Sequence, residues 1–104
     1  MGWCLWLDGS LLKACRVLKA RLEPLGYLVV CRHSLPDRAI DSMAARMGCV
    51  VASTDQHIIR AVMLTCWTIL PQEHVERKSA RDLATLILKQ VYRQCLGPMS
   101  PGPS

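Results

Sequence analysis

The segment that decides the fold is Cys49-Val-Val-Ala-Ser-Thr-Asp55, an apolar run that ends in two hydroxyl residues and a carboxylate. A helical pattern begins directly after it, at Gln56. This combination is typical of a buried strand whose last residue lies at the edge of a sheet. The N-terminal segment Trp3-Cys-Leu-Trp-Leu-Asp8 is built in the same way and also ends in an acid. We therefore expect two buried strands, each with an aspartate at its carboxyl end.

Strand-like and helical patterns alternate outward from these two segments. Glycine ends two of the helical patterns, at Gly26 and Gly48, in the position of a C-terminal cap. Such alternation predicts right-handed βαβ units, in which helices cover both faces of a parallel sheet. The predicted strands are residues 3–7, 27–31, 49–53 and 66–70; the predicted helices are residues 11–25, 35–47, 56–64 and 80–95; and residues 72–78 are predicted to form a polar loop.

The length of 104 residues indicates one domain. We predict an α/β three-layer sandwich over residues 1–96 and a disordered Pro/Gly tail over residues 97–104. If the first and third strands are neighbours, the strand order is 2-1-3-4. Asp8 and Asp55 then meet where the strand order reverses, which is the usual ligand position in parallel sheets.

The charge balance favours a polyanionic partner. Thirteen Lys and Arg against eight Asp and Glu give a net charge of +5, so nucleic acid is the first candidate. The longest apolar run, near residues 62–70, is far shorter than the roughly 20 residues that span a membrane. No signal-peptide pattern is present at the N-terminus. We therefore expect a cytoplasmic protein without a membrane partner.

Six cysteines stand in this short chain, four of them in strand-like runs and two in helical patterns. No Cys-x-x-Cys pair occurs, so the sequence gives no indication of a zinc site. We expect buried, reduced thiols that act as small apolar residues. The alternative is one or two disulfides, which are unusual in a mesophile cytosol and acceptable in a hyperthermophile.

Three acids, Asp8, Asp37 and Asp55, fall at the same end of the predicted sheet. Converging carboxylates repel each other unless cations neutralise them, and hard oxygen ligands suit Mg²⁺ or Mn²⁺. Each acid also has a purely structural explanation: a turn at Asp8, a capping box from Ser34 to Asp37, and a helix N-cap at Asp55. Asp41, one turn beyond Asp37, is expected to be a solvated helix residue with a smaller prospect of joining the site.

Several residues near these acids are candidates for holding a nucleic-acid substrate. Basic side chains of the first predicted helix form either a solvated face or a surface that contacts RNA, and His57 stands two residues after Asp55. Ser10 is expected to cap that helix. Gly9 is the lone glycine after the first strand, so no phosphate-binding loop is predicted. The substrate-binding candidates are Lys13, Arg16, Arg38, Thr54 and His57.

The segments Asp37-Arg-Ala-Ile-Asp-Ser-Met-Ala44 and Gly48-Cys-Val-Val-Ala-Ser-Thr-Asp55 resemble the PIN-like ribonucleases. In that family an Asp-x-x-Ile-x-x-x-Ala helix leads through a glycine to a strand that ends Thr-x-Asp. The opening Leu7-Asp-Gly-Ser-Leu11 and the segment Leu25-Gly-Tyr-Leu-Val-Val30 are similar to the minimal PIN-like branch, which includes toxins of toxin–antitoxin pairs. The resemblance covers about residues 4–70. It departs from the family pattern at Ser53, where Thr is usual, and at Thr54, where Arg is frequent.

The resemblance implies a Mg²⁺- or Mn²⁺-dependent endoribonuclease with a 2-1-3-4 parallel core. Asp8 and Asp55 match two acids of the family, and would ligate the metal. Asp37 matches the helix acid, as third ligand or water-orienting base. The implied partners are RNA and an antitoxin, and a homodimer is left open. The alternative is a catalytically degenerate PIN-like domain that binds RNA or a partner protein.

Overall fold

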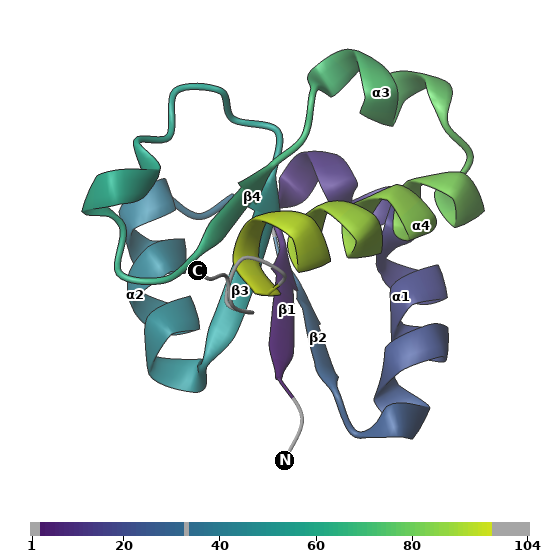
Figure 1. The fold of residues 1–104 in the computed structure, drawn as a ribbon, viewed down its shortest axis with the longest axis horizontal. Helices are drawn as coiled ribbons and strands as arrows, with labels where there is room; N and C mark the ends of the chain where they lie inside the picture. Colours follow the sequence, from purple (N-terminus) through teal and green to yellow (C-terminus); the bar gives the residue numbers. More distant parts are fainter. Residues whose placement is uncertain (1–2, 33, 97–104) are drawn as a thin grey trace, which may run out of the picture.

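A computed structural model describes residues 3–32 and 34–96. Four parallel strands form one sheet in the order β2-β1-β3-β4 (Figure 1). The predicted α/β class, parallel sheet and strand order are therefore confirmed. The strands are β1 at Cys4–Leu7, β2 at Leu28–Cys31, β3 at Cys49–Ser53 and β4 at Trp67–Ile69.

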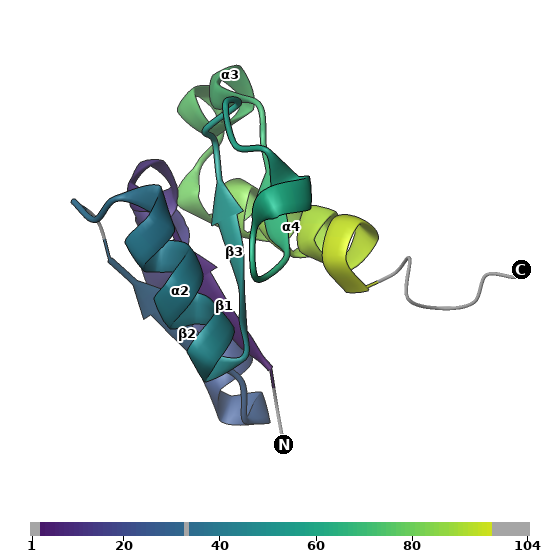
Figure 2. The ribbon, with the colours of Figure 1, turned by 90° about the vertical axis from the view of Figure 1, so that its left-hand side faces the viewer.

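Helices cover both faces of the sheet. Helix α2 packs on one face, and α1 and α4 pack on the other (Figure 1), while Figure 2 views the molecule from the α2 side. The helices are α1 at Cys15–Leu22, α2 at Asp37–Met47, α3 at Gln72–Arg77 and α4 at Ala80–Val91; 3₁₀ turns lie at Gly9–Ala14, Glu23–Leu25 and Arg60–Val62, and a π-helical turn at Tyr92–Leu96 continues α4.

Each face of the sheet has its own apolar core, because side chains alternate along every strand. Leu5 and Leu7 of β1 point toward α1 and α4, in a cluster that includes Leu18 and Ile87. The opposite cluster packs against α2 and contains two fully buried indoles, Trp6 and Trp67. These two tryptophans occupy the core as their strand positions indicate, whereas Trp3 is half-buried and stacks near Tyr27, with ring centroids 5.1 Å apart.

Two glycines end helical segments where a left-handed backbone is required. Gly26 has a φ of 94° after the turn Glu23–Leu25, and Gly48 has a φ of 75° after α2. The Gly48 amide donates to the carbonyl of Ala45. Any other residue would be strained at these angles. The predicted glycine caps are confirmed.

The predicted helix over residues 56–64 is wrong. Apart from the short turn Arg60–Val62, this segment is irregular, and Ile59, Val62 and Leu64 are 65–73% exposed. A helix of this length is stable only when its apolar stripe is buried, and here only Ile58 and Met63 pack against the core beside α2.

The predicted polar loop at residues 72–78 is also wrong, because most of it forms α3. Pro71 occupies the N-cap, where the missing N–H costs nothing, and Val75 is buried in the core on the α1 and α4 side. One buried valine in a polar hexapeptide is too weak a pattern to indicate a helix from the sequence alone.

One of the three expected helix caps forms as predicted, and two do not. Ser79 caps α4 as its sequence pattern indicates, with the Asp82 amide donating to Ser79 Oγ at 3.1 Å. In contrast, Asp8 caps the turn Gly9–Ala14 in place of Ser10, and Pro36 is the N-cap of α2 without a side-chain cap bond. The capping-box explanation of Asp37 is therefore wrong, which leaves that carboxylate available for other contacts.

The prediction of reduced thiols is wrong as well. Disulfides join Cys4 to Cys49, Cys15 to Cys31 and Cys66 to Cys95. Each bridge links segments that the sheet topology brings together: β1 to β3, α1 to the end of β2, and the start of β4 to the end of the chain's last helix. Cysteine positions in separate apolar runs did not reveal these pairings, because pairing depends on tertiary contacts.

Within the described ranges, no helix is both long enough and apolar enough to cross a membrane. The predicted disorder of the Pro/Gly tail, residues 97–104, concerns residues outside those ranges.

Candidate active site

The carboxyl edge of the sheet is built around the pairing of β1 with β3. Leu7 lies opposite Ala52, and the Asp8 amide donates to the Ala52 carbonyl at 3.0 Å. This bond continues the strand pairing by one residue beyond β1. Asp8 and the residues after Ala52 therefore leave the sheet side by side.

Asp8 is held in place by two hydrogen bonds. The Gly9 amide donates to Oδ1 of Asp8 at 2.7 Å, and the Ser53 hydroxyl donates to Oδ2 at 2.9 Å. Ser53 is fully buried, and its Oγ also accepts from the Asp55 amide at 3.1 Å. One serine thus connects the acid after β1 to the backbone of the acid after β3.

Asp37 reaches the same site from the first turn of α2. Its side chain forms a hydrogen bond with Asp55. Burial, that hydrogen bond and the negative charges of Asp55 and Asp8 raise the pKa of Asp37 to about 6. The three predicted acids therefore influence one another electrostatically, although they come from three separate parts of the chain.

Asp55 carries the negative charge of this pair. The His57 amide donates to Oδ1 of Asp55 at 2.9 Å. This bond and the hydrogen bond with Asp37 lower the pKa of Asp55, with a smaller contribution from the His57 side chain. Asp37 and Asp55 thus form a pair in which a proton on Asp37 favours the ionised form of Asp55.

The donor atoms of this site suit a hard divalent cation. Within residues 3–32 and 34–96, no three His, Cys, Asp or Glu side chains form a group ready to hold a metal ion. Mg²⁺ does not require such a cage, because it keeps several waters and is commonly bound through one or two carboxylates. The adjacent carboxylates of Asp37 and Asp55, with Asp8 nearby, fit that chemistry.

Asp41 is a structural residue and lies outside the site. It is only 5% exposed, and its carboxylate accepts from the amides of Leu64 at 2.8 Å and Thr65 at 3.1 Å and from Nε1 of Trp67 at 2.9 Å. Although burial acts to raise its pKa, these three donors lower it. The expectation of a solvated helix residue is wrong.

The predicted substrate-binding residues fall into two groups. Thr54 lies at the site, where its hydroxyl oxygen is 2.6 Å from that of Ser10. His57 is also at the site, because it is the second residue after Asp55, and it is exposed. Lys13, Arg16 and Arg38 are exposed, but no described contact connects them to the three acids.

Sequence reasoning missed the roles of Ser10 and Ser53. The Ser10 hydroxyl contacts that of Thr54, and the Ser53 hydroxyl donates to Asp8. Ser10 follows β1 shortly after Asp8, and Ser53 is the last residue of β3, two residues before Asp55. Their position at strand ends was a usable signal, because side chains at that edge converge whenever the strands are neighbours.

Comparisons of the chain with protein-family models, with curated proteins and with solved structures found no match. The resemblance to PIN-like ribonucleases therefore rests on the quoted residues.

Proposed function

We propose that this chain is a PIN-like, metal-dependent endoribonuclease. The observation that supports this most directly is the contact between Asp37 and Asp55, with the Asp8 charge close enough to raise the pKa of Asp37. Structural ion pairs usually bring opposite charges together, whereas this arrangement gathers like charges at a sheet edge. Carboxylates gathered in this way are typical of a divalent-cation site.

Asp8, Asp37 and Asp55 would hold a Mg²⁺ or Mn²⁺ ion. When bound, such an ion lowers the pKa of a water molecule and stabilises the charge that develops in phosphodiester cleavage. Ser53 orients Asp8 through its hydroxyl hydrogen. Asp37, with a pKa of about 6, exchanges a proton near neutral pH and is therefore suited to accept one from a water beside it.

RNA is the proposed substrate because the excess of Lys and Arg over Asp and Glu favours a polyanionic partner. The net charge is +5, although the site itself holds three acids. Lysines and arginines supply the electrostatic attraction for a phosphate backbone. An antitoxin or a second copy of the chain are further proposed partners, on the resemblance alone.

We also propose a cytoplasmic location, but the disulfides limit the kinds of cell in which that location is compatible with the structure. Three bridges join all six cysteines. Such bridges persist in oxidising compartments and in the cytosol of hyperthermophiles. A cytoplasmic location therefore goes together with a hyperthermophile source, and an oxidising compartment is the other setting that suits this chain.

A second candidate function is a degenerate PIN-like domain that binds RNA or protein without cleaving. The observation that favours it is that both oxygens of Asp8 already accept a hydrogen bond, from Gly9 and from Ser53. Each oxygen keeps one further lone pair, so Asp8 has less free acceptor capacity for a metal than a carboxylate without such bonds. Titration of the protein with Mn²⁺ separates the two functions, because absence of binding at millimolar concentration favours the degenerate domain.

The decisive test of catalysis is the Asp55→Asn variant. The amide oxygen of asparagine can still accept from the His57 amide, so the local backbone is retained. We expect at least about a hundredfold loss of RNA cleavage in Mg²⁺ or Mn²⁺, because a direct carboxylate ligand is removed. Cleavage is measured on a 5′-labelled single-stranded RNA, with circular dichroism to confirm the fold.

The matched control is Asp82→Asn, an exposed acid in the first turn of α4 that forms no part of the site. It should cleave at the wild-type rate. Wild-type activity that persists in EDTA, or an Asp55→Asn variant as active as the control, would contradict the proposal.

A further inference from the structure

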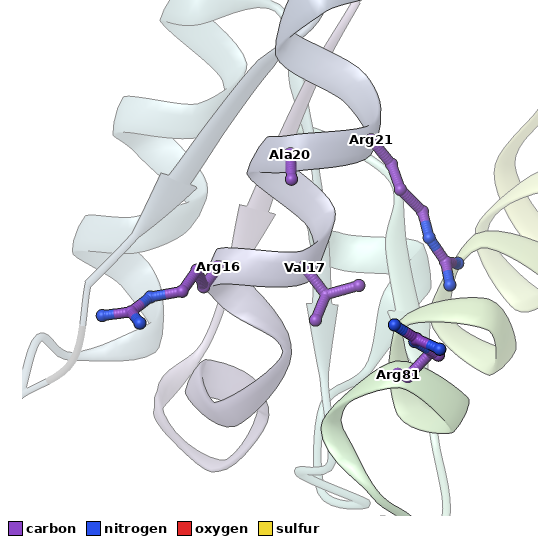
Figure 3. Close-up of a pocket in the computed structure, with 5 residues that line it drawn as sticks. All are labelled: Arg16, Val17, Ala20, Arg21 and Arg81. Carbon is purple, nitrogen blue, oxygen red and sulfur yellow. The ribbon is translucent and has the colours of Figure 1, made fainter.

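A groove between α1 and α4 has three arginines among its five lining residues. Its volume is about 510 Å³, and its lining residues are Arg16, Val17, Ala20, Arg21 and Arg81. Figure 3 shows the side chains of Arg21 and Arg81 extending toward each other from the two helices, with Arg16 reaching out from another side of α1. The acids of the candidate active site are not part of this lining, so the groove is a separate feature.

One of the two facing arginines, Arg21, is held in position by a threonine of α4. Arg21 donates from Nη1 to the Thr85 hydroxyl at 3.0 Å, and that hydroxyl donates to the Arg81 carbonyl at 3.3 Å. Thr85 therefore links the guanidinium from α1 to the backbone that carries Arg81. A fixed guanidinium loses less conformational entropy when it binds a ligand than a free one does.

Within residues 3–32 and 34–96, no carboxylate forms an ion pair with Arg21 or Arg81. Among the described residues, Arg21 has only the hydroxyl contact to Thr85, and no ion pair involves Arg16 or Arg81. Asp82, the next residue along α4, is exposed and does not line the groove. Two like charges that face each other are destabilising unless an anion lies between them.

Arg81 is also unfavourably placed within its own helix. It is the second residue of α4, at the end where the helix dipole is positive and where an acid is preferred. A bound anion would offset both the repulsion between Arg81 and the positive end of the α4 dipole and the repulsion between Arg81 and Arg21. The arginine arrangement and the helix position thus point independently to a negatively charged ligand.

We infer that this groove binds phosphate groups of the RNA backbone, at a site separate from the carboxylates. The guanidinium fork matches a phosphate with two parallel hydrogen bonds. All three arginines are exposed. Exposed arginines suit contacts that position the backbone of a polymer, whereas a small molecule is usually enclosed in a deep pocket. The identity of the polyanion as RNA rests on the proposed function.

The groove is also connected to the acidic site by a short length of chain. Asp8 caps the 3₁₀ turn Gly9–Ala14, and α1 follows at once with Arg16 as its second residue. The acidic site and the groove are therefore built from consecutive segments of the chain.

The test measures binding without cleavage. A 5′-labelled single-stranded RNA of about 12 nucleotides is titrated in EDTA and followed by fluorescence anisotropy at several salt concentrations. Each phosphate contact on a single strand contributes about 0.7 to the salt slope, which corresponds to about fivefold in affinity at 0.1 M salt. The Arg21→Gln/Arg81→Gln double variant should therefore bind about 25-fold more weakly, with a slope smaller by about 1.4.

The matched control is the Lys89→Gln/Arg93→Gln double variant, which removes the same charge from exposed positions outside the groove. It should weaken binding by less than about threefold, since it loses only a diffuse attraction. Replacing both groove arginines by lysine should preserve the salt slope, because the charges remain. Thermal melts of all variants exclude loss of the fold as the cause.

Equal weakening by the groove and control variants would overturn the inference. So would arginine-dependent binding of inorganic phosphate together with unchanged RNA affinity, which would indicate a small-anion site. A cleavage assay of the wild type in Mg²⁺ or Mn²⁺, run beside the binding assay, separates this inference from the proposed catalysis. RNA binding that depends on Arg21 and Arg81, in a protein that never cleaves, would support the groove and reject the nuclease.

Discussion

At the scale of single residues, the contact between Asp37 and Asp55 controls how the site responds to pH. Asp37 has a pKa of about 6, above its ordinary value of 3.8, because burial and two neighbouring carboxylates disfavour its charge. Below pH 4 it is neutral in both folded and unfolded chains. Between pH 4 and pH 6 the folded state retains a proton that the unfolded state has lost, so the stability supplied by Asp37 decreases as pH rises through this window.

The Asp37→Asn variant should therefore be more stable than the wild type at pH 7.5. Asparagine removes the repulsion with Asp55 and keeps a hydrogen-bonding amide. We expect a gain of about 1 kcal/mol after allowance for solvent screening, with a flatter stability profile between pH 4 and pH 6. Urea unfolding at a series of pH values measures both effects. A variant less stable than the wild type at pH 7.5 would show that the two carboxyl groups do not repel each other.

At the scale of secondary-structure elements, α2 carries two acids with different roles. Asp37, in its first turn, contacts Asp55, whereas Asp41, one turn later, is buried against the loop before β4. Of the three donors that Asp41 satisfies, only the Leu64 amide belongs to the segment 56–64 that was predicted to be a helix, whereas Thr65 follows that segment and Trp67 begins β4. Asp41 thus holds the end of the irregular loop and the start of β4 against α2.

The Asp41→Ala variant should lower the free energy of unfolding by about 3 kcal/mol, because one buried and two part-buried donors lose a charged acceptor. Since the pKa of Asp41 lies below 3.8, its stabilisation is fully present above that pH and is lost as pH falls through the lowered pKa. Chemical denaturation at pH 7 and pH 3 measures the difference. RNA cleavage by the folded variant should equal that of the wild type, whereas a selective loss of cleavage would place Asp41 in the site.

The sequence predicted those features of the site that depend on strand order. Asp8 and Asp55 follow apolar runs, so a parallel sheet with adjacent first and third strands brings them together. The contact partners of Ser10, Ser53 and Asp41 were not predictable. They depend on which backbone donors a loop leaves unpaired, and that is settled only by tertiary packing.

At the scale of the whole molecule, the three disulfides join parts of the chain that are far apart in sequence. The cysteine pairs are separated by 16, 29 and 45 residues, and they link β1 to β3, α1 to β2, and β4 to the chain's last helical turn. Periodicity identifies cysteines at apolar positions but gives no pairing, since six cysteines allow fifteen connectivities. For this reason the bridges were the largest feature that sequence reasoning did not recover.

Loss of a bridge should destabilise the fold, and the loss of stability should increase with the number of residues in the loop that the bridge closes. Chain entropy gives about 3 kcal/mol for Cys15–Cys31, about 3.5 kcal/mol for Cys66–Cys95 and about 4 kcal/mol for Cys4–Cys49. These are large fractions of the roughly 5–15 kcal/mol that stabilises a domain of this size. The measurement is thermal unfolding of the three Cys→Ser double variants under oxidising conditions. The wild type, purified without reductant, should show no reactive thiol after denaturation alone, and six after denaturation and reduction. Reactive thiols after denaturation without reductant, or a melting temperature unchanged by reduction, would show that the cysteines are buried and unpaired, as the sequence alone indicated.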